Sequence, residues 1–387
     1  MRNMTLACLG AMLCTASAFA QISPATTLAN PNSSSSPAAW VYVVSPLAGW
    51  DTETIGFQAS SAGKLTPIPG SPFKENLLYI AVDGSHLFGD TPIGTDIDAY
   101  KIESDGALSY EASTQVTKPG CSWPGPLQFD HTGATLYMYN IYGDPTCSNP
   151  VFDAYVVNKS TGKLTYLDYG ALGDYSDPAL TFTGNDEFAY TNGAPPTVLE
   201  RSSNGSLTAL SYYDLPPLPA SPYTKRGGYW PVIGQAADPY QHVALSFQLY
   251  APNTDAVGQE QLATYTVSSS GRLSTNSTYK NMPSVLVGTI NQLNMSPSGN
   301  LLAVAGTGGL QVFHFNGANP ITECTGLLSS DETDQIHWDN DDHLYAMSRD
   351  SNLLRVFSVT PTSHSQAAGS PYTINEPIAL VVQTLPR

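Results

Sequence analysis

The chain has 387 residues, of which 15 are lysine or arginine and 32 are aspartate or glutamate, giving a formal net charge of −17. This acidic balance repels nucleic-acid phosphates and anionic lipid headgroups, so we expect neither as a partner. Charged residues make up only 12% of the chain, whereas Gly, Pro, Tyr, Ser and Thr are abundant. Such a composition is typical of short strands and tight turns.

The start of the chain has the layout of a cleavable secretory signal. Arg2 precedes an apolar run over 6–13 and a small-residue site at 18–20, and the run is too short to anchor in a bilayer. We therefore predict a signal peptide over 1–20. Residues 21–39, rich in Ser, Pro, Asn and Ala, are predicted to be a flexible lead-in. We expect an exported protein, periplasmic or extracellular and without membrane insertion, whose folded domain covers 40–387.

Two signatures recur along the rest of the chain. A strand-turn-strand pattern begins at Leu127, Leu180, Leu293 and Ile336. A turn reading Gly-x-Leu, set between two strands, begins at Gly63, Gly106, Gly162, Gly205 and Gly271. The mean spacing is about fifty residues, within the range of propellers and solenoids. Each repeat supplies four short strands that bury their faces only against neighbouring repeats, which favours one repeat domain over two ordinary domains.

Seven repeats fit the chain, which predicts an all-β fold, a seven-bladed β-propeller of four-stranded antiparallel blades. The count requires residues 40–44 to be the second strand of a blade whose inner strand, 378–382, comes from the other end of the chain. That pairing of the N- and C-terminal strands would close the ring and remove its unpaired edges. We expect a monomer.

Three segments near the first blade carry a family resemblance: Tyr42-Val-Val-Ser45, Thr54-Ile-Gly-Phe57 and the stretch 63–73, which ends in Gly-Ser-Pro-Phe. The chain resembles the lactonase-like seven-bladed propellers with YVTN-type repeats, which include 6-phosphogluconolactonase and carboxymuconate cyclase. The resemblance implies a lactone substrate held by a converging Arg and His. No Arg-His pair stands at the matching connections, such as 119–125 and 225–231, so that activity is not carried over residue by residue.

In a propeller, the outer-to-inner connections and the second-to-third-strand loops emerge on one face, around the channel mouth. This face is the expected ligand site, because concave surfaces with convergent polar groups bind small molecules. The residues predicted to gather there as ligand contacts are Trp123, Lys225, Arg226, Tyr229, Trp230, Asn291 and Arg349. Acid-base chemistry, if present, would come from Asp177, Asp334 and Glu376, with Arg226 assisting.

The segment 225–231 stands out, because it combines two cations and two aromatic rings beside glycines in an acidic protein. Rings that stack on a ligand and an arginine that clamps an anion would need such a mixture. The alternative is that Tyr229 and Trp230 pack between blades while Lys225 and Arg226 are solvated.

Three cysteines follow the predicted signal. Cys121 and Cys147 fall in two loops expected on the mouth face of the third blade, and export favours their pairing as a disulfide. The alternative is two reduced thiols. Cys324 remains as the odd thiol, expected to be buried.

The sequence predicts neither a metal nor a cofactor. Residues 339–342 in the acidic stretch align with the repeated turn and lack calcium-loop spacing, so they are interpreted as a solvated hairpin. His131, His337 and His343 lie in or beside that turn and are interpreted as structural or exposed, on the face opposite the mouth. No nucleophile elbow or phosphate-binding glycine loop is present.

Three functions remain open. The first is a non-catalytic exported propeller that binds a small molecule, glycan or protein at the channel mouth. The second is a lactone hydrolase or isomerase acting on a neutral or weakly anionic substrate. The third is a structural role in a surface assembly. Propellers host many unrelated functions, so the fold does not choose among them.

Overall fold

Side-chain burial falls steeply from the second strand of a repeat to its outer strand. β22 (Leu301–Gly306) and β26 (His343–Ser348) are buried at every position, whereas β28 (Ser363–Gln366) is exposed at every position. The second strands are therefore rich in apolar residues, because neighbouring sheets cover both of their faces. This gradient is expected of sheets that stack face to face around a ring.

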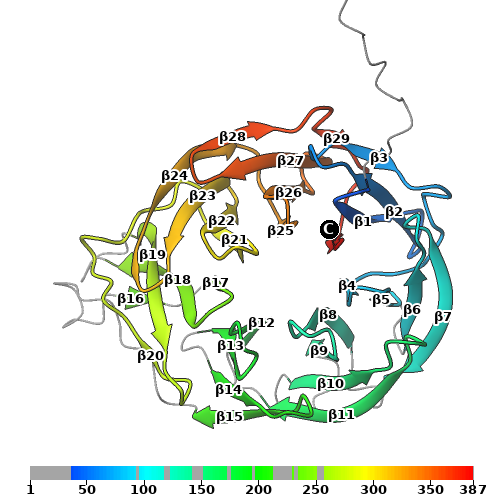
Figure 1. Ribbon diagram of the computed structural model, residues 1–387, viewed down its shortest axis with the longest axis horizontal. Helices are drawn as coiled ribbons and strands as arrows, with labels where there is room; N and C mark the ends of the chain where they lie inside the picture. The colour runs from blue at the N-terminus through cyan, green and yellow to red at the C-terminus, as the bar shows by residue number, and fades with distance from the viewer. Residues whose placement is uncertain are drawn as a thin grey trace, which may run out of the picture. The chain divides into compact units, whose positions relative to one another are not determined.

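The computed structural model describes residues 36–92, 96–116, 123–141, 151–171, 176–193, 197–211, 229–230, 234–250 and 257–386. From Ser36 onward they belong to one unit. Its strands form seven antiparallel sheets arranged in a ring (Figure 1), and no helix occurs among the described residues. The predicted all-β, seven-bladed propeller is thus confirmed.

The strands of each blade are named here in their order from the centre of the ring outward. Blade 1 has β30 (Ala379–Thr384), β1 (Ala39–Pro46), β2 (Thr52–Ala59) and β3 (Leu65–Pro67). Blade 2 has β4 (Ile80–Val82), β5 (His86–Asp90), β6 (Asp96–Ile102) and β7 (Leu108–Gln115). Blade 3 has β8 (Trp123–Phe129), β9 (Thr135–Ile141), β10 (Val151–Val157) and β11 (Leu164–Ala171). Blade 4 has β12 (Ser176–Phe182), β13 (Phe188–Gly193), β14 (Val198–Arg201) and β15 (Leu207–Ser211).

Blades 5 and 7 each carry one additional short strand. Blade 5 has β17 (Gln235–Ala237), β18 (His242–Tyr250), β19 (Val257–Val267) and β20 (Leu273–Ser274), with β16 (Tyr229–Trp230) also on β18. Blade 6 has β21 (Ile290–Met295), β22, β23 (Gly309–Asn316) and β24 (Asn319–Ser329). Blade 7 has β25 (Gln335–Trp338), β26, β27 (Leu353–Thr360) and β28, with β29 (Tyr372–Thr373) also on β27.

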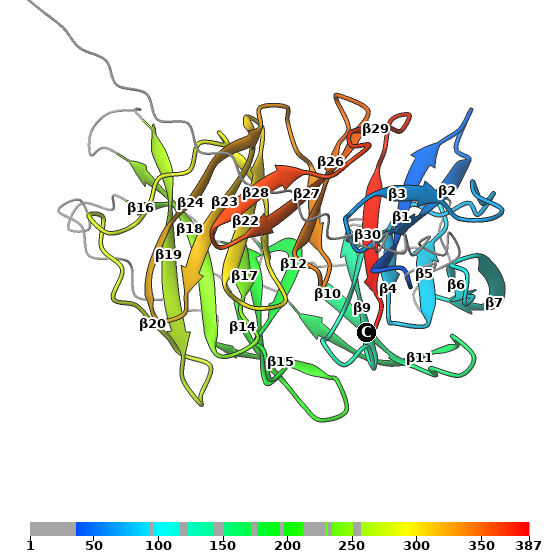
Figure 2. The ribbon, with the colours of Figure 1, turned by 45° about the horizontal axis from the view of Figure 1, so that its top comes forward.

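The ring closes within blade 1, by the pairing that the repeat count requires. β30 pairs with β1 in antiparallel register, with Tyr42 opposite Val381. The pairing continues past both strand ends, where Ile378 N donates to Val44 O and Leu385 N to Ala38 O. Figure 2 shows β30 beside β1, joining the two ends of the chain.

The Gly-x-Leu signature marks contacts between neighbouring blades. Tyrosine hydroxyls on second strands donate to glycine carbonyls of this turn in the next blade: Tyr42 to Gly106 at 2.8 Å, Tyr137 to Gly205 at 2.7 Å and Tyr190 to Gly271 at 2.7 Å. Gly205 has a φ of 101°, and a Cβ there would lie 2.3 Å from Thr135 Oγ1. A glycine is needed because the turn must adopt this conformation directly against the adjacent sheet.

Glutamines join the inner strands, which belong to different sheets. Gln292 Oε1 accepts from Ile336 N at 2.7 Å, and Gln335 Oε1 accepts from Leu380 N at 2.8 Å. Gln128 binds the amide and carbonyl of Leu180 through both ends of its side chain. Amides of this kind satisfy inner-strand backbone groups that no sheet neighbour reaches.

The turn between β25 and β26 differs from its interpretation as a solvated hairpin. It is a hairpin turn, but Asp339 is fully buried. Its carboxylate accepts from His343 N at 3.0 Å and the Tyr345 hydroxyl at 2.8 Å, and it binds His343 Nδ1 at 2.8 Å. The expectation of solvation was wrong for this residue, because a polar turn in the sequence does not reveal that its first carboxylate faces the next strand. Cys324 is partly buried, with its Sγ 3.9 Å from Thr360 O.

Candidate functional site

Consecutive strands of a blade run in opposite directions, so two kinds of connection lie at the same end of the ring. These are the loops from second to third strands and the connections from an outer strand to the next inner strand. We call this end the mouth, and the other end, with the turns from inner to second strands, the turn end. Between them runs a channel of about 720 Å³, lined by the inner strands of all seven blades. It is the natural place to look for a ligand site.

Amides dominate the polar lining of this channel. They are contributed by Gln128, Gln235, Asn291, Gln292, Asn294 and Gln335. The titratable lining residues are Tyr79, His131, Asp334 and His337. Burial lowers the pKa of His337 to about 4, so this histidine is neutral at physiological pH. The lining therefore offers hydrogen bonds from neutral groups and few charges.

At the mouth, Asp334 and Arg349 are held together by blade 7. Asp334 lies just before β25, and its Oδ2 accepts from the Arg349 backbone N at 2.7 Å. Arg349 lies in the loop from β26 to β27, and its Nε donates to Pro377 O at 3.4 Å. Its side chain is exposed, and its two terminal nitrogens make no hydrogen bond with the described residues. The terminal nitrogens of a guanidinium in this position can bind a hydroxyl or an anion.

Asn291 and Glu376 flank this pair. Asn291 Nδ2 donates to Thr333 O at 3.0 Å, which links the start of β21 to the connection before β25. Glu376 is exposed, and its backbone N donates to Asn352 Oδ1 at 2.6 Å. These contacts hold the outer-to-inner connections of blades 6 and 7 at the mouth.

Two residues of blade 2 belong to the same region and were missed by sequence reasoning. Asp90 ends β5 and is fully buried; its Oδ1 accepts from Tyr79 N at 2.6 Å, and its Oδ2 has no hydrogen-bond partner among the described residues. Burial raises the pKa of Asp90 to about 7. Burial is the main cause that raises the pKa of Tyr79, and the charge of Asp90 raises it further, whereas the charge of Arg349 lowers it. The rule that second strands end at the mouth could have found Asp90.

Across the ring, Glu260 of β19 is a second buried carboxyl. It is 4% exposed, and in the part of the chain that the structure describes its Oε2 has no hydrogen-bond partner. Burial raises the pKa of Glu260 to about 7, against the opposing effect of a hydrogen bond from the Ile290 amide. Both groups can therefore hold a proton near neutral pH.

An exposed tryptophan stands at the mouth between blades 7 and 2. Trp50 is 81% exposed, in the hairpin that joins β1 to β2. Ser45 Oγ binds the hairpin to Asn375 O at 2.5 Å on one side, and Thr52 N binds it to Asn76 Oδ1 at 3.0 Å on the other. Sequence reasoning missed Trp50, although the second-to-third-strand rule covers its position.

The structure describes only part of the remaining predicted site residues. Lys225, Arg226, Cys121 and Cys147 lie outside the described residues, and so does the predicted disulfide. The backbones of Trp123 and Asp177 lie at the starts of inner strands β8 and β12, and Tyr229–Trp230 form β16 beside the end of β18. Among the described residues, no group of three or more His, Cys, Asp or Glu side chains could hold a metal ion.

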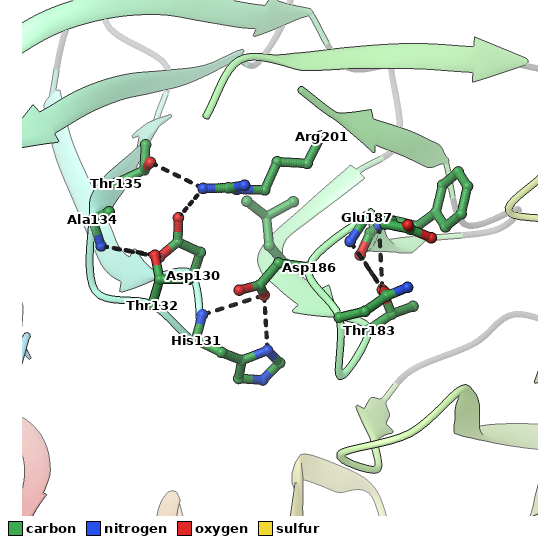
Figure 3. Close-up of polar contacts among 12 residues, drawn as sticks. Asp130, His131, Thr132, Ala134, Thr135, Thr183, Asp186, Glu187 and Arg201 are labelled. Atoms are coloured by element: carbon green, nitrogen blue, oxygen red, sulfur yellow. Dashed lines mark hydrogen bonds and ion pairs between the residues drawn. The ribbon is translucent and has the colours of Figure 1, made fainter. Parts of the chain in front are cut away.

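A second polar cluster lies at the turn end, between blades 3 and 4 (Figure 3). Asp130 Oδ2 binds Arg201 Nη2 at 2.5 Å, and Arg201 Nε donates to the Tyr137 hydroxyl at 3.2 Å. Beside this pair, His131 Nδ1 lies 2.8 Å from Asp186 Oδ1. The cluster joins the blades through charged groups where most blade contacts are apolar.

Comparison with solved structures places the fold among lactonase-like seven-bladed propellers. The Pseudomonas aeruginosa periplasmic gluconolactonase is 15% identical over 90% of this chain and 99% of its own, with a TM-score of 0.60. A Bacteroides fragilis protein proposed to be a 6-phosphogluconolactonase is 12% identical over 91% of this chain and 99% of its own, with a TM-score of 0.58. The chain matches no protein-family model and no curated protein sequence.

The same fold also serves other chemistry. The hydrazine synthase of Kuenenia stuttgartiensis is 12% identical over 89% of this chain and 99% of its own, with a TM-score of 0.54. These likenesses establish the lactonase-like propeller fold, and the function has to be argued from the site. In the part of the chain that the structure describes, no helix has the length and apolarity to cross a membrane.

Proposed function

We propose that the mouth of this protein's channel is a non-catalytic binding site, which holds a small hydroxylated molecule of the sugar or sugar-acid class. The observation that carries the proposal is the amide-rich channel, which opens beside the guanidinium of Arg349, whose two terminal nitrogens make no hydrogen bond with the described residues. Neutral amides suit hydroxyl groups, and the guanidinium adds a charged donor for a hydroxyl or carboxylate. Trp50 supplies an exposed ring that can stack on a sugar face.

Arg349→Ala is expected to weaken ligand binding about tenfold, because a hydrogen bond to a charged group contributes roughly 1.5–3 kcal/mol. The measurement is a thermal-shift screen with glucose, cellobiose, gluconate and fresh glucono-δ-lactone, followed by calorimetric titration of the best ligand. Lys64→Ala, which removes an exposed cation from the turn between β2 and β3, is the matched control and should bind like the wild type. A wild type that none of these probes stabilises, or an Arg349→Ala variant of unchanged affinity, would count against the proposal.

The second candidate is hydrolysis of a sugar lactone, and the fold likeness to a gluconolactonase favours it. Asp90 adds a buried carboxyl beside Tyr79 that can hold a proton close to neutral pH. The same screen separates the two functions, because a lactonase would consume glucono-δ-lactone faster than its spontaneous hydrolysis. Binding without turnover would support the binding propeller.

We also propose that the protein is exported as a monomer after loss of residues 1–20, with Cys121 and Cys147 paired. These proposals rest on the leader pattern and on the acidic, cysteine-poor mature sequence. The intact mass of the protein secreted from a host with a Sec pathway should correspond to an N-terminus at Gln21. Thiol alkylation should modify Cys324 alone before reduction; modification of all three mature cysteines would refute the disulfide.

A further inference from the structure

The turn end of the channel holds a histidine unlike the other aspartate-bound histidines of the ring. His131 lines the channel just after β8, and its side chain is 57% exposed. Its Nδ1 lies 2.8 Å from Asp186 Oδ1. Figure 3 shows Nε2 on the side of the ring away from Asp186.

Asp186 is held firmly by its surroundings. It is 5% exposed, has a φ of 56°, and donates its backbone N to Thr183 O at 2.8 Å. Its Oδ1 also accepts from the backbone N of His131 at 3.3 Å, so one oxygen holds both the backbone and the ring. The turn itself is anchored to blade 5, because Gly184 N donates to Tyr240 O at 3.2 Å. The imidazole is thus oriented by a fixed carboxylate.

The three other aspartate–histidine pairs are built differently. In each, both residues belong to the same turn of one blade: Asp83 with His86, Asp238 with His242, and Asp339 with His343. The side chains of His86 and His343 are 3% exposed, and that of His242 is 23% exposed. His86 also binds Glu111 through Nε2 at 2.9 Å. These pairs fit a structural role, whereas His131 reaches across two blades and faces the channel.

We propose that His131, oriented by Asp186, is a general base at the turn end of the channel, acting on neutral acyclic esters small enough to enter it. An aspartate on Nδ1 keeps the proton of neutral imidazole there and leaves Nε2 as the acceptor. The proposal concerns the opposite end of the channel from Arg349, so it does not depend on ligand binding at the mouth.

The proposed step is a hydrolysis. Nε2 of neutral His131 takes a proton from a water molecule, whose oxygen bonds to the carbonyl carbon of the ester. The bond from this carbon to the alkoxide oxygen then breaks as the carbonyl re-forms. The proton on Nε2 passes to the leaving alkoxide, giving an acid and an alcohol and regenerating the neutral imidazole.

The charges around His131 determine the pH dependence of this step. Hydrogen bonding to Asp186 raises the pKa of His131, partly opposed by burial, and the Asp130 carboxylate and the Thr183 carbonyl raise it further. Asp130 is itself paired with Arg201, which limits its effect. The neutral imidazole is the active form, so the rate should rise with pH through a midpoint above the ordinary histidine value.

His131→Gln is expected to reduce the protein-catalysed hydrolysis of p-nitrophenyl acetate tenfold or more, since general-base catalysis contributes roughly 10²–10⁴-fold. The assay uses the full mature protein between pH 5 and 9, with the spontaneous rate subtracted. His364→Gln is the matched control: it removes an exposed histidine from outer strand β28, away from the channel, and it should retain the wild-type rate.

Asp186→Asn gives an independent readout, because removing the carboxylate should shift the midpoint of the pH profile to lower pH. This shift decides the matter if His131→Gln does not fold. A wild-type rate equal to the spontaneous rate, equal rates for His131→Gln and wild type, or an unshifted midpoint in Asp186→Asn would overturn the proposal.

Discussion

Arg201→Met is expected to lower the free energy of unfolding by about 3–5 kcal/mol at neutral pH, because it leaves a buried carboxylate without its cation. The Asp130 side chain has no exposed surface, and that of Arg201 is 11% exposed. Asp130 Oδ1 keeps hydrogen bonds from Thr132 Oγ1 at 2.7 Å and Ala134 N at 3.1 Å, so we expect the lower part of this range. Denaturant unfolding of the mature protein measures the loss.

The loss should shrink in acid. Burial alone would raise the pKa of Asp130, but the Thr132 hydrogen bond and the charge of Arg201 hold it below its ordinary value of 3.8. A depressed carboxyl pKa contributes stability that is present above the unfolded pKa and is lost as the pH falls through the folded value. The gap between wild type and Arg201→Met is therefore greatest near neutrality and closes below about pH 4.

Two further variants test the cause. The double variant Asp130→Asn/Arg201→Met should recover much of the loss, because neither charge then remains buried alone. Lys163→Met, which replaces an exposed cation in the neighbouring β10–β11 turn, should change stability by less than about 0.5 kcal/mol. If the double variant were no more stable than Arg201→Met, loss of packing and not of charge pairing would explain the effect.

Asp90→Asn should stabilise the protein by up to about 4 kcal/mol above pH 8, because it removes a buried charge while keeping an acceptor for Tyr79 N. The pKa of Asp90 rises from 3.8 to about 7 on folding, so the folded state binds more protons between these values. Wild-type stability should therefore fall as the pH rises from about 4 to 7. The asparagine variant lacks this contribution, and its advantage should grow over the same window.

Unfolding curves at pH 4, 6 and 8 test this prediction. Asp51→Asn, which removes an exposed carboxylate from the β1–β2 hairpin at the mouth, should stay within about 0.5 kcal/mol of wild type at each pH. A constant difference between Asp90→Asn and wild type across the series would show that Asp90 does not change its protonation in this range.

The sequence by itself determined the architecture. The repeated strand-turn-strand pattern and the Gly-x-Leu turns predicted seven blades and the closing pair of terminal strands, and β30 pairs with β1 as the count requires. Such patterns are readable because each strand's apolar content follows from its place in a stacked blade, and each glycine is required by a turn pressed against the next sheet.

Only the tertiary structure decided which polar residues act together. Arg349 contacts both Asp334 and Pro377 at the mouth, and His131 contacts Asp186 of another blade. Asp90 and Asp339 are buried, although carboxylates are usually solvated. These partners are 15 to 55 residues apart in the sequence. A local pattern reports whether a strand forms, whereas the environment of a side chain at a strand end depends on loops from neighbouring blades that carry no periodic signal.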